Sequence, residues 1–238
     1  MTGKLLGVAS GVSLAVLAVL ALVVVPPDAV QGDAQRLMYV HVPTAWLAYL
    51  AFFVTAVASV LWLWPRTRAP HWDLLAGSSA EVGVVFTGLT LALGSLWGRP
   101  IWGTWWEWDA RLTTTLVLFF LYVGYLALRR TGATADERGK RCAIAALIAF
   151  ADVPVVHFSV TWWETLHQDA TVFNPDLDVR MEGFWMPFTL VFSVLAFTLL
   201  YATLVRTRLR LAELDEGREE RELQRAIEER RRAEVVPA

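Results

Sequence analysis

The chain has 238 residues, of which 56% are hydrophobic and 18% charged, and its formal net charge is −2. A soluble domain averages about 45–50% apolar and about 25% charged residues, so this composition excludes an ordinary soluble protein and indicates a membrane protein. The near-neutral charge gives no sign of a nucleic-acid partner. Cys142 is the only cysteine, which excludes a disulfide framework within the chain, and no Cys-x-x-Cys-His motif occurs.

Six apolar runs are long enough to cross a bilayer, which takes about 20 helical residues. We therefore predict an all-α integral membrane protein in which residues 1–205 form a six-transmembrane-helix bundle. The first run is interpreted as a span and not as a cleaved signal peptide, because it exceeds the usual ~7–15 apolar residues and lacks a small-x-small cleavage site. The expected spans are approximately 5–25, 42–64, 79–97, 112–128, 142–160 and 184–205.

The distribution of Lys and Arg predicts the orientation, because these residues stay on the cytoplasmic side of a membrane. They are concentrated at 65–78, at 129–141 and at the start of the tail 206–238, so we expect both termini to be cytoplasmic. We expect the tail to be a solvated polar helix, with a contact to a cytoplasmic partner as the alternative. The other connections contain only Arg36, Arg99, Arg111 and Arg180.

One segment, residues 97–113, contains five of the twelve tryptophans and lies between two predicted spans. If Trp102 to Arg111 is helical, four side chains share one face, because residues three and four apart are neighbours on a helix. Such a face would be an aromatic platform for a large, flat, apolar ligand. The alternative is an aromatic belt that anchors the protein at the membrane surface. The four side chains are Trp102, Trp105, Trp106 and Asp109.

The run Gly-Thr-Trp-Trp-Glu-Trp-Asp-Ala-Arg-Leu-Thr, residues 103–113, resembles the "WWD" signature of the haem-handling proteins of cytochrome c maturation. Tyr-Val-His-Val-Pro around His41 and Trp-Trp-x-Thr-Leu-His-Gln around His167 are similar to one branch, the haem exporter protein C family, CcmC. The resemblance covers roughly residues 35–205. It implies a protein of the inner membrane that delivers haem to the periplasmic chaperone CcmE. The implied partners are an ATP-driven transporter, components CcmA and CcmB, and a small subunit, CcmD.

Two of the four histidines, His41 and His167, are expected on the outward side together with the tryptophan-rich loop 98–111. His41 should precede the second span, whose first turn would contain Pro43. Neutral imidazole is a common axial ligand of haem iron, and the resemblance implies that these two histidines are the ligands. His157, expected within the fifth span, is the reserve candidate, and His71 is interpreted as structural.

Several other side chains are candidates for contact with haem b, which this chain would hold non-covalently. Arg111 is the first candidate partner of the propionates and Arg36 the second, because arginine matches carboxylate geometry. Trp108 completes the expected aromatic site, while Asp109 could orient an imidazole, hold Arg111 or shape the loop. Asp152 with its nearby proline could mark a kink, and it is left without a function, as is Glu81.

Other functions remain open from the sequence. A haem–apocytochrome c synthase subunit shares the tryptophan signature, although such relatives usually have more spans. An integral b-type cytochrome usually buries histidine pairs within its spans, whereas here only His157 is expected there. A haem-free permease subunit would use its tryptophans as lipid anchors. No enzyme motif occurs, and without a phosphate-binding Gly-rich loop any use of nucleotide belongs to a partner.

Overall fold

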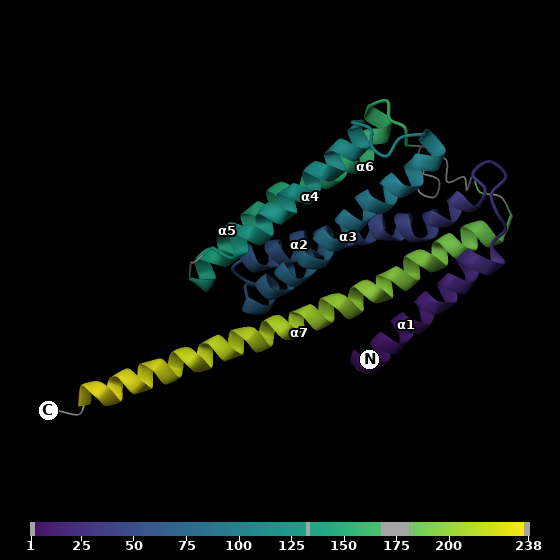
Figure 1. Ribbon diagram of the computed structural model, residues 1–238. Helices are drawn as coiled ribbons and strands as arrows, with labels where there is room; N and C mark the ends of the chain where they lie inside the picture. Colours follow the sequence, from purple (N-terminus) through teal and green to yellow (C-terminus); the bar gives the residue numbers. More distant parts are fainter. Residues whose placement is uncertain (1–2, 132–133, 168–180, 182, 236–238) are drawn as a thin grey trace.

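The computed structural model describes residues 3–131, 134–167, 181 and 183–235, and these are helical with short connections (Figure 1). Six helical segments are long and apolar enough to cross a membrane, which confirms the predicted all-α, six-span class. The elements are α1 (Gly3–Val19) with the π-helical turn η1 (Leu20–Val24), the 3-10 turn η2 (Asp33–Leu37), α2 (Met38–Leu63), α3 (Pro70–Trp102), α4 (Ala110–Arg129), α5 (Ala135–Phe150), α6 (Asp152–Trp162) and α7 (Trp185–Val235).

The antiparallel pair α2 and α3 lies at the centre of the molecule, with α1 and α7 against one side and α4, α5 and α6 against the other (Figure 1). Each side has its own apolar core. Leu47 and Phe86 belong to the core shared with α1 and α7, whereas Phe52 and Tyr122 belong to the core shared with α4, α5 and α6. The rings of Phe52 and Tyr122 stack with centroids 3.6 Å apart, so α2 and α4 are in direct contact through aromatic side chains.

Close approach of α2 to α3 depends on glycine at position 83. A methyl group added there would lie 2.5 Å from Cε1 of Phe52, which is shorter than any real contact. Hydroxyl groups add to this interface, because the Ser79 hydroxyl donates to the Ala51 carbonyl at 2.7 Å and contacts the Tyr201 hydroxyl of α7 at 2.7 Å. Hydrogen bonds between helices are one of the forces that hold transmembrane bundles together.

Several helix boundaries differ from the sequence expectation. α2 begins at Met38, so His41 lies inside this helix and not before it, and Pro43 lies beyond the first turn. α3 begins with Pro70 at its first turn, where a missing N–H costs nothing. α7 runs without interruption from the expected sixth span through the charged tail to Val235. The fifth span is divided at Ala151 into α5 and α6.

The break between α5 and α6 has a local cause. Pro154 lies in the first turn of α6, where its missing N–H cannot bond back to the last turn of α5. Asp152 begins α6, and one of its carboxylate oxygens is buried without a hydrogen-bond partner among the described residues. The proline and the aspartate therefore mark a kink, the simpler of the readings that the sequence left open.

The three connections predicted to face outward lie together at one end of the bundle (Figure 1). They are residues 25–37, residues 103–109 and the described part of the segment between α6 and α7, which ends at His167. Residues 168–180 and 182, which form most of the connection between α6 and α7 and include Arg180, lie outside the described residues, as do 236–238 of the tail. The α2–α3 and α4–α5 turns lie at the opposite end.

Candidate functional site

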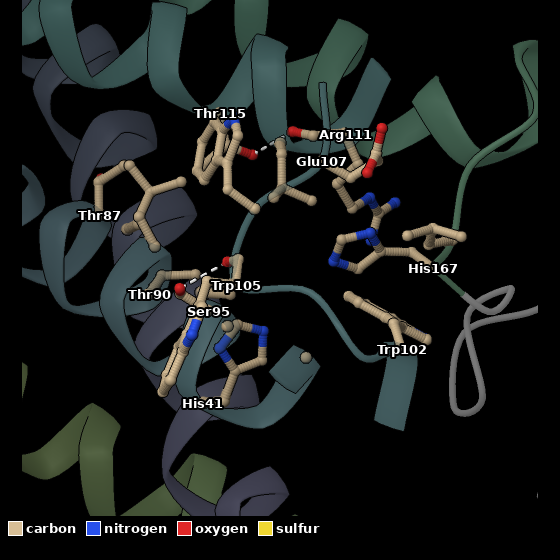
Figure 2. Close-up of a pocket in the computed structure, with 18 of the residues that line it drawn as sticks. His41, Thr87, Thr90, Ser95, Trp102, Trp105, Glu107, Arg111, Thr115 and His167 are labelled. Carbon is tan, nitrogen blue, oxygen red and sulfur yellow. Dashed lines mark hydrogen bonds between the residues drawn. The ribbon is translucent and has the colours of Figure 1, made fainter. Parts of the chain in front are cut away.

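A cavity opens at the end of the bundle where these three connections meet, between α2, α3 and α4 (Figure 2). It contains about 820 Å³ of empty space including its open mouth. Its floor reaches the apolar core beside α4. Its lining includes His41 and Tyr49 from α2, Thr90 and Gly94 from α3, Trp105 and Trp106 from the loop, Arg111 and Leu118 from α4, and His167.

The tryptophan-rich segment is not one helix, so the premise of a shared helical face is wrong. α3 ends at Trp102 because Gly103 adopts φ +77°, a left-handed conformation that stops a helix at little cost for glycine. Residues 103–109 form an irregular loop before α4. The Ser95 hydroxyl holds this loop against α3 by donating to the Trp105 carbonyl at 2.6 Å. The loop, and not helical periodicity, brings the indoles to the cavity.

The indoles around the cavity have different degrees of exposure. Trp106 is half-buried, and its Nε1 is enclosed without a hydrogen-bond partner among the described residues. Trp102 and Trp105 are 36% and 56% exposed and line the mouth. Trp108 is 72% exposed, contacts Trp106 edge-on at 5.4 Å between centroids, and does not line the cavity. Three of the four predicted tryptophans therefore surround the same space.

His41 projects from the first turns of α2 into the cavity beside Trp105 (Figure 2). Its ring lies against α3 at a glycine, since a methyl group added at Gly94 would be 3.0 Å from Cε1. Trp97 contacts the ring edge-on, with centroids 5.7 Å apart. The Nδ1 atom is buried and has no hydrogen-bond partner within the described part of the chain. A buried nitrogen without a partner costs free energy, which a ligand at this position would recover.

His167 reaches the cavity from the opposite wall, where a carboxylate holds its ring. Its Nδ1 lies 3.3 Å from Oδ2 of Asp109, and the ring contacts Trp102 edge-on at 4.9 Å. An imidazole whose Nδ1–H donates to a carboxylate offers its other nitrogen, Nε2, as a ligand atom. Burial lowers the pKa of His167 below its usual value, while Asp109 opposes this shift, so the neutral ring is favoured.

Asp109 has two structural roles. Its Oδ1 accepts a hydrogen bond from the backbone N–H of Leu112 at 2.8 Å and so caps α4. Its Oδ2 also accepts from the backbone N–H of Leu166 at 3.2 Å. Of the three roles left open by the sequence, this carboxylate orients an imidazole and shapes the loop, while its hydrogen bonds go to residues other than Arg111.

Arg111 lies on the cavity wall and is braced from behind by α6. Its Nη2 donates to the His157 carbonyl at 2.9 Å, and its Nε lies 3.5 Å from the Ser159 hydroxyl. A guanidinium has five N–H donors, so donors remain for a ligand carboxylate. Arg36 does not line the cavity, because it pairs with Asp33 at 2.8 Å and donates to the Ala21 carbonyl at the end of α1.

The remaining histidines lie outside the cavity. His157 is exposed on α6 and does not face the bundle interior, and its ring contacts the edges of Phe158 and Tyr49. His71 lies at the opposite end of the bundle, at the start of α3 beside Trp72. The structure therefore brings together the two histidines predicted as a pair and separates them from the other two.

Sequence reasoning missed several residues of the site, above all those of α3. Small residues four apart, such as Gly94 and Gly98, are typical of close helix–helix approach in membranes, but here side chains fill the space beside them. A methyl group at Gly94 would touch His41, one at Gly98 would lie 3.0 Å from Trp102, and one at Gly88 would lie 3.3 Å from Phe119. The four-residue spacing of Gly94 and Gly98 is the signal in the sequence that something packs closely against α3. It does not show whether the neighbour is a side-chain ring or the backbone of another helix.

The site combines features that suit a planar aromatic ligand with a metal centre and acidic substituents. Two imidazoles face one space, indoles line its walls and mouth, and a braced guanidinium lies beside His167 (Figure 2). Imidazoles ligate transition metals, aromatic faces stack on flat ligands, and a guanidinium pairs with carboxylates. The buried nitrogens without partners at His41 and Trp106 leave hydrogen-bonding capacity that a bound ligand could use.

Comparison with known proteins gives a consistent result over most of the chain. The family model described as CcmC, Heme exporter protein C, matches residues 1–225. The chain is 42% identical over 180 residues to Heme exporter protein C of Bradyrhizobium diazoefficiens, which covers 75% of this chain and 66% of that protein. It is 41% identical over 186 residues to Heme exporter protein C of Escherichia coli K12, covering 78% of this chain and 73% of that protein.

A further relative comes from a plant. The putative cytochrome c biosynthesis ccmC-like mitochondrial protein of Marchantia polymorpha is 40% identical over 176 residues, which is 73% of this chain and 72% of that protein. The resemblance inferred from the tryptophan-rich segment is thus confirmed by comparisons that extend far beyond it. This chain belongs to the haem exporter protein C (CcmC) family.

Proposed function

We propose that this protein binds haem non-covalently during cytochrome c maturation and passes it to a periplasmic haem chaperone similar to CcmE. Its relatives are named as haem exporters or as a cytochrome c biosynthesis protein. The observation that carries the proposal is the pair of imidazoles, His41 and His167, in one aromatic cavity at the end of a membrane-spanning bundle.

In this proposal His41 and His167 are the axial ligands of the haem iron, and the haem is cargo. The partnerless Nδ1 of His41 and the carboxylate-held ring of His167 both fit that role. Cys142 is buried in the core between α4 and α5 and is the only cysteine, so a thioether bond from this chain to the cargo is not expected. Arg111 is the proposed partner of a propionate. Arg36, engaged at the end of α1, is not carried into the proposal.

The open mouth suits transfer to an acceptor. Trp102 and Trp105 line it and are exposed, so they can hold the ring while one haem edge stays accessible. Trp108, outside the cavity and more exposed still, is available for contact with the acceptor. A stacked aromatic contact adds about 0.5–1.5 kcal/mol beyond area burial, a modest gain per ring that suits a cargo that must also leave.

The proposed setting follows from the family and from the charge distribution. The protein would lie in the inner membrane with both termini in the cytoplasm and the cavity on the periplasmic side. It would act with an ABC-type transporter formed by CcmA-like and CcmB-like subunits, together with a small CcmD-like subunit. Its role would be transport and chaperoning, without catalysis of its own.

Replacement of adjacent tryptophans tests the transfer role. We expect Trp105→Ala/Trp106→Ala to insert normally and to abolish haem delivery, measured as haem-stained chaperone after co-expression, with membrane protein level as the reference. The matched control is Trp162→Ala/Trp163→Ala, because these adjacent tryptophans lie at the same end, are also exposed, and do not line the cavity. If both pairs behave alike, the tryptophans are a lipid belt and the proposal is wrong.

A further inference from the structure

A hydrogen-bonded tryptophan lies behind His41, outside the cavity lining. The indole N–H of Trp97 donates to Oε1 of Gln31 at 3.1 Å, and the same indole contacts the edge of the His41 ring, with centroids 5.7 Å apart and planes at 69°. Trp97 is half-buried and does not line the cavity. It can therefore act on a ligand only through His41.

The acceptor of this hydrogen bond is itself held in place. The Gln31 backbone N–H donates to Oδ1 of Asp28 at 2.7 Å, and that of Val30 donates to the same atom at 2.9 Å. Asp28 and Gly32 exchange two backbone hydrogen bonds of 3.2 and 2.9 Å, and Gly32 adopts φ +56°. The result is a closed turn between α1 and α2 that presents the Gln31 amide to Trp97.

His41 differs from His167 in how its ring is held. His167 has a carboxylate on Nδ1, whereas Nδ1 of His41 has no hydrogen-bond partner among the described residues. The orientation of the His41 ring therefore depends on packing against Gly94 and Trp97 and on the backbone of Thr90 beside it. Removal of one of these contacts should free the ring to rotate.

We propose that Trp97, held by Gln31, is a positioning residue that fixes the His41 imidazole for axial ligation. The inference rests on the proposed haem function and adds residues that the tryptophan signature and the cavity lining do not include. A metal–imidazole bond requires the ring nitrogen to point along one direction, so contacts that fix the ring strengthen ligation. The alternative is that the Trp97–Gln31 hydrogen bond only anchors the turn between α1 and α2.

Two substitutions remove the hydrogen bond from its two ends. Trp97→Phe keeps an aromatic ring beside His41 but has no N–H, and Gln31→Leu keeps the size of the side chain but has no acceptor. The rescue variant Gln31→Glu restores an acceptor for the indole. Trp72→Phe is the control, because its indole N–H also donates a hydrogen bond, to the Thr67 carbonyl at 3.0 Å, and it lies at the opposite end of the bundle, outside the cavity lining.

The readout is the coordination state of bound haem in the purified full-length protein, measured by optical and EPR spectroscopy, together with titration by free imidazole. We expect Trp97→Phe and Gln31→Leu to lower the six-coordinate, low-spin fraction and to admit imidazole. The expected fall in the ligation equilibrium is about threefold to tenfold, the range that one neutral hydrogen bond gives. The double variant should equal the stronger single variant, because both remove the same interaction. Gln31→Glu and Trp72→Phe should keep the wild-type spectrum.

The outcomes separate this inference from the function on which it rests. If wild type loses its six-coordinate spectrum in His41→Ala while Trp97→Phe and Gln31→Leu keep it, Trp97 is not a positioning residue and the haem site stands. If the two variants lower protein yield but not the six-coordinate fraction, the hydrogen bond only anchors the turn, and the inference is again wrong. If His41→Ala leaves the wild-type spectrum unchanged, the proposed haem site itself fails.

Discussion

The two ends of the bundle are built from different interactions. At the end where α1 begins and α3 starts, ion pairs join helices: Asp73 of α3 binds Arg129 of α4 through two bonds of 2.7 and 3.0 Å, and Arg138 of α5 bridges Asp73 and Glu216 of α7 at 3.5 and 3.0 Å. At the other end, imidazoles and indoles surround a cavity (Figure 1, Figure 2). One end connects helices to one another, and the other is open to a ligand.

The two ends also differ in which buried polar atoms lack hydrogen-bond partners. At the ion-paired end both oxygens of Asp73 have partners, and Glu81, unassigned from the sequence, pairs with Arg208 of α7 at 2.6 Å. Among the buried side-chain nitrogen and oxygen atoms of the described residues, Nε of Arg138 lacks a partner there. At the cavity end His41 and Trp106 each retain a buried nitrogen without one. A protein tolerates such costs where binding repays them, so the proposed haem binding and the ion pairs between helices lie at opposite ends.

The largest expected effect comes from removing the central carboxylate of the ion-paired end. Asp73→Ala leaves the largely buried Arg129 without its partner, which costs about 3–5 kcal/mol for a buried pair. Urea unfolding in mild detergent should show this loss, while the haem spectrum per folded molecule stays unchanged. Asp136→Ala is the control, because its pair with Arg68 is exposed and should be worth less than about 1 kcal/mol. Equal losses in the two variants would contradict the assignment of stability to Asp73.

The next effect concerns the carboxylate at the other end. Asp109→Asn can still cap α4, but it weakens the support of His167, and outer-shell partners of this kind are worth about 10- to 100-fold in metal affinity. We expect a loss of haem affinity in that range, measured by transfer to a haem-scavenging protein, with little loss of stability. Glu107→Gln is the matched control, since Glu107 is an exposed carboxylate that also lines the cavity. Equal haem affinities of Asp109→Asn and wild type would show that the carboxylate does not contribute to haem binding.

A smaller effect is expected at the glycine beside His41. In Gly94→Ala the added methyl group would lie 3.0 Å from Cε1 of His41, so the ring must shift by a few tenths of an ångström. Overpacking of this kind costs about 1–3 kcal/mol at most sites. We expect a loss of binding free energy at the low end of this range, because the His41 ring faces a cavity. Gly124→Ala on α4 is the control, since nothing lies within 4 Å of the added atom. The six-coordinate fraction should fall in the first variant only.

The smallest effect is a pKa difference in the ligand-free protein. Burial lowers the pKa of His167 below 6.5 by disfavouring the charged ring, and Asp109 opposes that shift. Asp109→Asn removes the opposing charge, so the pKa of His167 should fall further. At pH 6.5 and above the neutral ring predominates in both proteins, and protonation at lower pH favours states with an exposed ring. Nitrogen-15 NMR titration of the imidazole measures both values, and a pKa in the variant equal to or above that of the wild type would contradict the carboxylate contact.

The sequence predicts the helices better than the connections between them. The length of the apolar runs identifies all six spans, because a run of about 20 apolar residues is typical of a membrane-spanning helix. The pairing of His41 with His167 follows from their expected position on the same side. The shape of residues 103–109 could not be predicted, because Gly103 ends the helix through one left-handed residue while the surrounding residues permit a helix. Contacts distant in sequence, such as that between Gly94 and His41, leave no local pattern at either residue.

Polar roles were the hardest to predict. Three roles were open for Asp109, and the choice depends on His167, 58 residues away in sequence. Arg36 and Arg111 have the same chemistry, yet only Arg111 lines the cavity, because Arg36 is held by the end of α1. His157 is exposed on α6, which begins after the break at Ala151. The sequence does not show which way the chain turns at such a break.

The most direct test of the central claim compares the four histidines in purified, haem-loaded protein. Optical and EPR spectra of His41→Ala, His167→Ala, His157→Ala and His71→Ala should divide them into two pairs. We expect the first two to lose the six-coordinate, low-spin signature and the last two to keep the wild-type spectrum. Wild-type spectra in both His41→Ala and His167→Ala, or loss of the signature in His157→Ala alone, would contradict the bis-histidine site.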